Sequence, residues 1–152
     1  MNPEEVKRFI KKFNFAVEFI EHSGVDGTTS EQAAIAHGVP IERIIKTLVF
    51  TDKSGKAAIV IIQGNKRVDT KKIPGLKHPD LVNAETLKKL IDGKIGGVAP
   101  LALPENLPKY VDRGVMALDE VYGSGGSPFT GIKFNPEILL YLPNYLVTDL
   151  AK

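Results

Sequence analysis

The stretch RIIKTLVFTDKSGKAAIVIIQ, residues 43–63, decides the fold because it contains two β-rich runs around a turn. Residues 44–51 and 56–63 are dominated by β-branched and aromatic side chains, which favour strands. Between them, Asp52-Lys53-Ser54-Gly55 is a turn-forming sequence. We therefore expect these two runs to pair as an antiparallel hairpin.

One residue of the first run does not fit its apolar pattern. Side chains alternate between the faces of a strand, so Lys46 shares a face with Ile44, Leu48 and Phe50. In the ordinary case such a lysine lays its stem over apolar neighbours and keeps its ammonium in water. The alternative is a lysine that serves as the polar anchor of an apolar pocket.

The N-terminal segment predicts a helix followed by a strand. Asn2 is a suitable N-cap, Pro3 suits the first helical position, and the apolar spacing continues to about Asn14. Residues 15–20 then alternate in a way that favours a strand, with continuation of the helix as the alternative.

A second helix is predicted over SEQAAIAH, residues 30–37. Thr29 and Gln32 have the spacing of a capping box, and Gly38 lies where a left-handed glycine ends a helix. The remaining predicted elements are a helix AETLKKLI between Asn83 and Gly93, strands at 111–118 and 130–134, and a last helix EILLYL begun by Asn135-Pro136-Glu137.

These elements predict an α+β fold. The strands outnumber the crossover helices that a parallel sheet needs, and the hairpin favours antiparallel pairing. We expect residues 1–152 to form one domain with a mixed, largely antiparallel sheet curled into a barrel and with peripheral helices.

Composition excludes several kinds of site. The chain has no cysteine, which excludes thiol nucleophiles, disulfides and CxxC sites. His22, His37 and His78 lack the spacing of zinc ligands, so we expect no metal and no cofactor. No apolar run approaches the ~18 residues of a membrane span, and MNPEEVKRF is unlike a signal peptide, so we expect a cytoplasmic protein without membrane contact.

Two glycine-containing loops accompany the lysine strand. In IGGVAPLALP, residues 95–104, Gly96-Gly97 and Pro100 predict a sharp, stiff loop whose bare amides can approach a ligand oxygen. In YGSGGSPFTG, residues 122–131, glycines and small hydroxyls can shape a pocket wall, although the spacing and the lysine of a P-loop are missing. Either loop alone is more often a simple connection.

Taken in order, these motifs resemble one known family. The run EHSGVDGTTSEQAAIAHGVPIERIIKTLVF, then IGGVAP, then GGSPFTGIKFNPEILLYL resembles the YbaK/prolyl-tRNA-synthetase-associated domain family over nearly the whole chain. The most specific element is the lysine strand, with Lys46-Thr47, joined to a GxxxP loop from Gly96 to Pro100. The resemblance implies a compact α+β domain with a central barrel, and a pocket between the lysine strand and the GxxxP loop. It also implies hydrolysis of mischarged aminoacyl-tRNA in trans.

This activity assigns roles to particular residues. Ester hydrolysis builds negative charge on the carbonyl oxygen, which amides of the Gly96–Ala99 loop could stabilise, so we expect Gly96 and Lys46 to be catalytic. We name no protein base, because the resemblance points to assistance by a ribose hydroxyl of the substrate. Residues expected to bind the substrate are His22, Thr47, Gly97, Val98, Ala99, Pro100, Gly126 and Ser127.

Small loop residues favour a small amino acid, namely alanine, serine or cysteine. The resemblance implies that tRNA(Pro) or a related tRNA carries it. The loop reads GGVAP where the subgroup that removes cysteine resembles GGCSP, which puts cysteine in doubt. The formal charge is only +2, but one basic segment is a candidate tRNA contact, although a solvated surface is its ordinary role: Lys66, Arg67, Lys71, Lys72, Lys77 and His78.

The expected partners are aminoacyl-tRNA and, as a candidate, an aminoacyl-tRNA synthetase, with the chain as a monomer or homodimer. Two other functions stay open at this point. One is a module that binds an aminoacyl-tRNA end or a small ligand without turnover. The other is an unrelated enzyme in which Lys46 forms a Schiff base, which requires a lowered lysine pKa.

Overall fold

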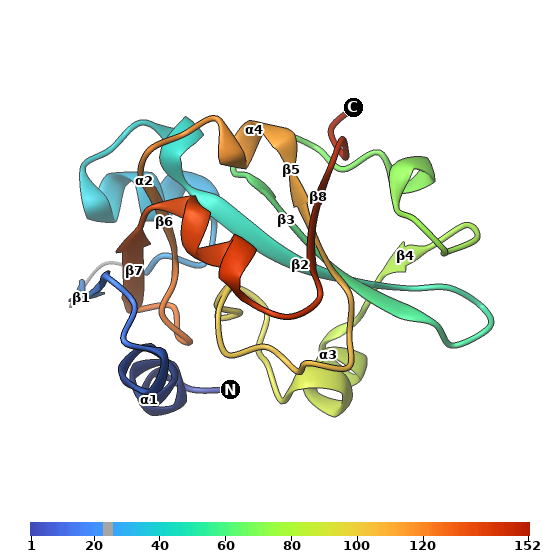
Figure 1. Cartoon of the computed structure of the whole chain (residues 1–152), viewed down its shortest axis with the longest axis horizontal. Coiled ribbons are helices and arrows are strands. Elements are labelled where there is room, and N and C mark those ends of the chain that lie inside the picture. Colours follow the sequence, from blue (N-terminus) through green and yellow to red (C-terminus); the bar gives the residue numbers. More distant parts are fainter. Residues whose placement is uncertain (23–25) are drawn as a thin grey trace.

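The computed structural model describes residues 1–22 and 26–152 of the chain. Its strands form two sheets. The larger has the order β4-β2-β3-β5-β8, and the smaller has the order β1-β7-β6 (Figure 1). The bounds of the strands are β1 Val17–Glu21, β2 Ile45–Thr51, β3 Ala57–Gln63, β4 Asp80–Leu81, β5 Lys109–Asp112, β6 Val121–Ser124, β7 Thr130–Phe134 and β8 Tyr145–Thr148.

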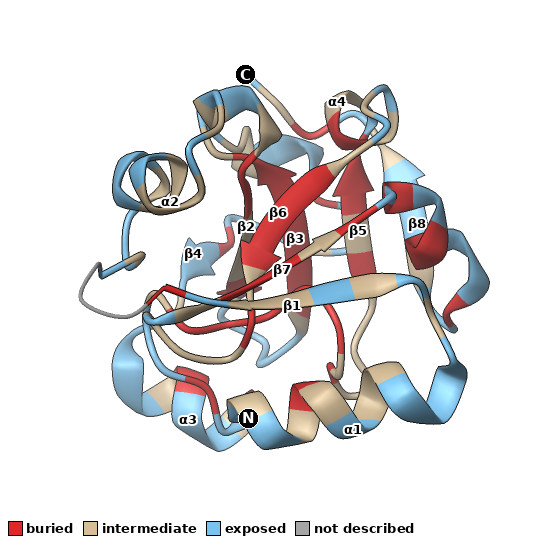
Figure 2. Cartoon of the chain, turned by 90° about the vertical axis from the view of Figure 1, so that its left-hand side faces the viewer, coloured by how far each residue is buried: buried red, intermediate tan, exposed pale blue. Residues whose placement is uncertain are grey.

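Helices lie around these sheets. The α-helices are α1 Pro3–Phe13, α2 Ser30–His37, α3 Ala84–Ile91 and α4 Arg113–Met116, and the 3₁₀ helices are η1 Ile41–Arg43, η2 Thr70–Lys72 and η3 Pro136–Tyr141. Figure 2 shows buried strands in the middle of the molecule, with α1 and α3 beneath them and α2 at one side. Within the described ranges, no helix is long and apolar enough to cross a membrane.

The predicted hairpin is confirmed. β2 and β3 pair antiparallel from Ile45 opposite Gln63 to Thr51 opposite Ala57. The Asp52 carboxylate accepts hydrogen bonds from the amide and hydroxyl of Ser54, which closes the turn. β3 then pairs in parallel with β5, so the hairpin occupies the centre of the larger sheet.

Local capping signals placed most helices correctly. The Asn2 side chain accepts from the Glu5 amide, and Asn14 ends α1 with φ 53°, so residues 17–21 form a strand and the alternative of a continued helix is wrong. Thr29 and Gln32 form the capping box of α2, which Gly38 ends. α3 covers the predicted AETLKKLI, but its left-handed C-cap is Asp92 and not the expected Gly93, and the last helix is 3₁₀.

The barrel prediction is wrong, because neither sheet closes on itself. In the described part of the chain, the two sheets are connected by an isolated parallel bridge between Ile44 and Tyr122. β4 and β8 remain the edges of one sheet, and β1 and β6 the edges of the other. A barrel needs a continuous ladder of paired strands, and here the ladder is interrupted between β2 and β6.

The predicted strand over 111–118 is also wrong after Asp112. β5 ends at Asp112, and residues 113–116 form α4. The Asp112 carboxylate caps this turn by accepting from the Gly114 amide, and its other oxygen accepts from the Leu150 amide. This buried carboxylate therefore turns the chain where the apolar pattern alone continues as a strand.

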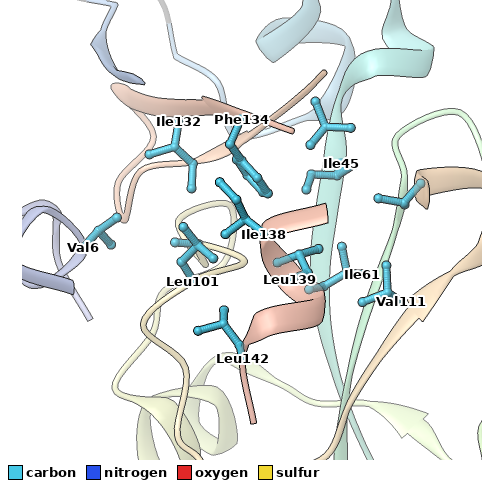
Figure 3. Close-up of a cluster of buried hydrophobic side chains, with 13 residues drawn as sticks. Val6, Ile45, Ile61, Leu101, Val111, Ile132, Phe134, Ile138, Leu139 and Leu142 are labelled. Carbon is cyan, nitrogen blue, oxygen red and sulfur yellow. The ribbon is translucent and has the colours of Figure 1, made fainter. Parts of the chain in front are cut away.

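The main core lies between the two sheets. Ile45, Ile61 and Val111 of the larger sheet point toward η3 and the smaller sheet (Figure 3). They pack with Ile132 and Phe134, both almost fully buried. The core thereby fixes the position of β2 relative to β6 and β7, the strands that border the site described next.

Candidate active site

A cavity of about 270 Å³ lies where β2 and β6 separate. Its walls come from the first half of β2, one side of α2 along its length, the GxxxP loop and the segment from β6 to β7. Six of the residues predicted for the site line this cavity: His22, Lys46, Thr47, Gly96, Val98 and Ser127.

The other four predicted residues lie behind the cavity wall. The Gly97 amide donates to the Lys94 carbonyl, and the amide of the fully buried Ala99 donates to the Met1 sulfur at 3.2 Å. Pro100 packs against Gly123, where an added Cβ would approach the proline ring to 3.0 Å, and Gly126 lies against the backbone of Asn2. These positions shape the loops that carry the lining residues.

Lys46 is half-buried at the cavity wall. Burial lowers the pKa of its ammonium, the Glu31 carboxylate opposes that shift, and the positive charge of Arg67 adds to it. Because its charge acts on Lys46, Arg67 of the predicted basic segment lies near the part of the cavity that Lys46 lines. Among the described residues, the cavity lining itself carries no carboxylate, and Glu31 acts on Lys46 from outside that lining.

The GxxxP loop presents two free amides. Gly96 has φ +79°, and a Cβ built on it would lie only 2.5 Å from Cγ2 of Thr28. Within residues 1–22 and 26–152, the backbone N–H groups of Gly96 and Val98 donate to no protein acceptor. Both residues line the cavity, which makes these amides available to an oxygen of a ligand.

The segment after β6 is held by its own hydroxyls. The Ser124 hydroxyl accepts from the Gly126 amide, and the hydroxyls of Ser127 and Thr130 lie 2.9 Å apart. This network fixes the wall opposite β2. It uses the hydrogen-bonding capacity of Ser127, which favours a role in shaping the pocket over direct contact with phosphate.

Sequence reasoning missed His37. Its ring lies 5.0 Å from the ring of His22, edge to face, and 5.0 Å from the ring of Tyr122. Burial and the nearby His22 lower the pKa of His37. A glycine inside a strand often marks a place where another group approaches the backbone closely. Gly131 is such a case, because a Cβ added to it would overlap the His37 ring. Nothing in the sequence, however, connects the two positions.

Replacing His37 with leucine should reduce the loss of stability at acid pH. Folding lowers the pKa of His37. As the pH falls through the ordinary value of 6.5, His37 therefore binds a proton more readily in the unfolded chain than in the folded one, and the free energy of unfolding decreases. Urea unfolding at about pH 7.5 and about pH 5.5 measures this difference for wild type and His37→Leu. Exposed His78→Asn gives the background change, and an unaltered pH dependence in His37→Leu would contradict the assignment.

Residues 25–139 match the family model described as an aminoacyl-tRNA editing domain. The chain belongs to this aminoacyl-tRNA editing domain family. The resemblance read from the lysine strand and the GxxxP loop is therefore confirmed. In the described ranges, no group of three His, Cys, Asp or Glu side chains could hold a metal ion.

Relatives of this editing domain include an uncharacterised protein, YwhH of Bacillus subtilis, 31% identical over 73% of the chain and 72% of that protein. Another is the "putative Cys-tRNA(Pro)/Cys-tRNA(Cys) deacylase EbsC" of Enterococcus faecalis, 26% identical over 78% of the chain and 74% of that protein.

Two crystal structures share the fold closely. The hypothetical protein APE2540 has a TM-score of 0.89 and 30% identity, covering 97% of this chain and 99% of that one. A "putative trans-editing enzyme for prolyl tRNA synthetase" has a TM-score of 0.86 and 28% identity, covering 99% of this chain and 96% of that one.

Proposed function

We propose that this editing domain is a deacylase that hydrolyses the ester of mischarged aminoacyl-tRNA in trans, with residues 1–152 acting as one unit. The observation that carries the proposal is the cavity that brings Lys46 together with the free amides of Gly96 and Val98. The relatives named as a deacylase and as a trans-editing enzyme support the same reaction.

In this reaction, water attacks the ester carbonyl and the bond to the terminal ribose oxygen breaks, which releases the amino acid and leaves a ribose hydroxyl. Negative charge develops on the carbonyl oxygen in the transition state, and the amides of Gly96 and Val98 stabilise it. Lys46 holds the phosphate or the carbonyl side of the ester in place by its charge. We name no protein base, and in line with the family resemblance a ribose hydroxyl of the substrate assists the attacking water.

The substrate is a small amino acid on tRNA(Pro) or a related tRNA. Val98 and Gly96 line the cavity with little bulk, and the cavity volume of about 270 Å³ leaves limited room beside a ribose. Pocket size alone separates amino acids by only ~1–3 kcal/mol per methylene, so alanine, serine and cysteine are all candidates. A prolyl-tRNA synthetase is the candidate protein partner, on the example of the trans-editing relative.

The test is release of amino acid from tRNA(Pro) charged separately with alanine, serine and cysteine. Release above the uncatalysed rate from at least one of them is expected. Tight binding of charged tRNA without release from any of them would instead support the alternative, a module that captures the aminoacyl-tRNA end.

Replacing Arg67 with alanine should weaken tRNA binding and lower its salt dependence. Arg67 is exposed and its charge acts on Lys46, so it lies where a phosphate near the pocket would be neutralised. Loss of one phosphate contact reduces the slope of log K against log salt by about 1. Binding titrations at several salt concentrations measure that slope.

Lys72→Ala is the matched control for this experiment. The Lys72 ammonium already binds the Asp149 carboxylate at 2.9 Å and the Ala151 carbonyl at 2.8 Å. Lys72→Ala should therefore change the slope of log K against log salt less than Arg67→Ala does. A slope unchanged in Arg67→Ala would remove Arg67 from the tRNA interface.

A further inference from the structure

The edge of β2 beside the cavity has no partner strand. β4 pairs with β2 only at Phe50 and Thr51, and the bridge to β6 lies at Ile44. In the described part of the chain, Thr47 therefore has a ladder partner on one side only, where it lies opposite Ile61 of β3.

The register sets the direction of the Thr47 backbone groups. The Gly64 amide donates to the Ile44 carbonyl, so this carbonyl points toward the β3 side. On the other side, the Val82 amide donates to the Val49 carbonyl. Because hydrogen-bonding direction alternates along an antiparallel strand, the N–H and C=O of Thr47 point away from β3, toward the gap occupied by the cavity.

The Thr47 side chain adds an unsatisfied hydroxyl. Its oxygen is buried and has no hydrogen-bond partner, the single such side-chain atom among the described residues. Buried hydroxyls are normally paired, and leaving one unpaired destabilises a protein. Thr47 lines the cavity, so a polar group of a bound ligand can supply the missing partner once a small shift of the neighbouring atoms exposes the oxygen.

The ligand chemistry follows from what the wall offers. Every aminoacyl ester carries an α-amino group, and no carboxylate in the described wall could pair with it. Glu31 and Asp26 act on Lys46 and Thr28 from outside the lining, so the acceptors within the lining are neutral. Successive side chains lie on opposite faces of a strand, so the Thr47 and Lys46 side chains leave β2 from opposite faces, although both residues line the cavity.

We infer that Thr47 binds the α-amino group of the aminoacyl ester, through its hydroxyl and its backbone carbonyl. This inference rests on the proposed function for the identity of the ligand. It makes the free α-amino group, common to all aminoacyl-tRNAs, a requirement for binding. Esters of hydroxy acids are then poor ligands even when their side chain is small.

Non-hydrolysable amides of 3′-amino-3′-deoxyadenosine test this directly, one carrying alanine and the other lactate, in which a hydroxyl replaces the α-amino group. Wild type should bind the alanyl compound about tenfold more tightly than the lactyl compound, and Thr47→Val should lose most of that preference. Thr47→Ser, which keeps the hydroxyl, should retain it. Equal binding of the two compounds by wild type, absence of binding, or an unchanged preference in Thr47→Val would overturn the inference.

Thermal unfolding of the ligand-free variants gives a second readout. Valine has nearly the shape of threonine, so Thr47→Val removes an unpaired hydroxyl and should raise the unfolding midpoint. A lower midpoint would mean that the hydroxyl is satisfied within the protein and would overturn the inference. Because the amides report binding alone, a protein that prefers the alanyl amide but releases no amino acid from tRNA would contradict the proposed deacylase and leave the inference standing.

Discussion

Lys46→Ala should lower kcat/KM for deacylation by about a hundredfold or more. Lys46 is a half-buried cation in a cavity lining without described carboxylates, and its removal takes away both positioning and charge stabilisation. Single charge-stabilising groups in other enzymes contribute factors of about 10² to 10³. Single-turnover release of amino acid from mischarged tRNA measures the effect.

Two further variants make this result specific. Lys53→Ala removes an exposed lysine from the β2–β3 turn, far along the hairpin from Lys46, and should keep the wild-type rate. Lys46→Arg keeps the positive charge but cannot form a Schiff base, so partial activity in this variant supports an electrostatic role. A folded Lys46→Ala protein that deacylates at the wild-type rate would contradict the role of Lys46.

Gly96→Ala should be the second most damaging change, again by about a hundredfold in kcat/KM. The new Cβ would meet Thr28, whose Cα lies 3.0 Å away, and the residue has φ +79°, which disfavours any side chain. The loop must shift, and the amides of Gly96 and Val98 move with it. Measurement of kcat and KM separately should place most of the loss in kcat, because these amides act on the developing negative charge.

Gly55→Ala separates backbone strain from the loss of geometry. Gly55 also has a positive φ of +86°, but its Cβ would meet nothing within 4 Å, and it lies in the hairpin turn. The Gly55→Ala variant should have a lower free energy of unfolding and the wild-type kcat and KM. If Gly96→Ala behaves like Gly55→Ala, with reduced stability and normal kcat, the loop amides do not stabilise the transition state.

The fold was predictable where local interactions decide it. Asn2, Thr29 and Asn83 each cap a helix through a bond to a residue three positions along, and Asp52 closes a turn through Ser54. The failures involve partners that are distant in sequence. Asp112 bonds to Leu150, 38 residues away, and turns a predicted strand into α4. The open edge of β2 depends on where β4 and β6 end, which no local pattern encodes.

The same division applies to the site. Lys46 and Gly96 were predictable because an ammonium in an apolar row and a glycine pair before a proline are visible in the sequence. His37 was not, because an α2 residue contacts His22 and Tyr122 only after the chain folds. Ala99 and Pro100 were expected in the pocket, yet they lie behind the lining. The Ala99 amide donates to the Met1 sulfur, and the Tyr145 hydroxyl donates to the Pro100 carbonyl.

The most direct test of editing compares mischarged with correctly charged tRNA in one experiment. Wild-type protein is mixed in excess with Ala-tRNA(Pro) or with Pro-tRNA(Pro), and the remaining ester is followed over time. Editing predicts rapid loss of the alanyl ester while the prolyl ester decays at its uncatalysed rate. Equal loss of both esters, or loss of neither with any small amino acid on the tRNA, would contradict the account.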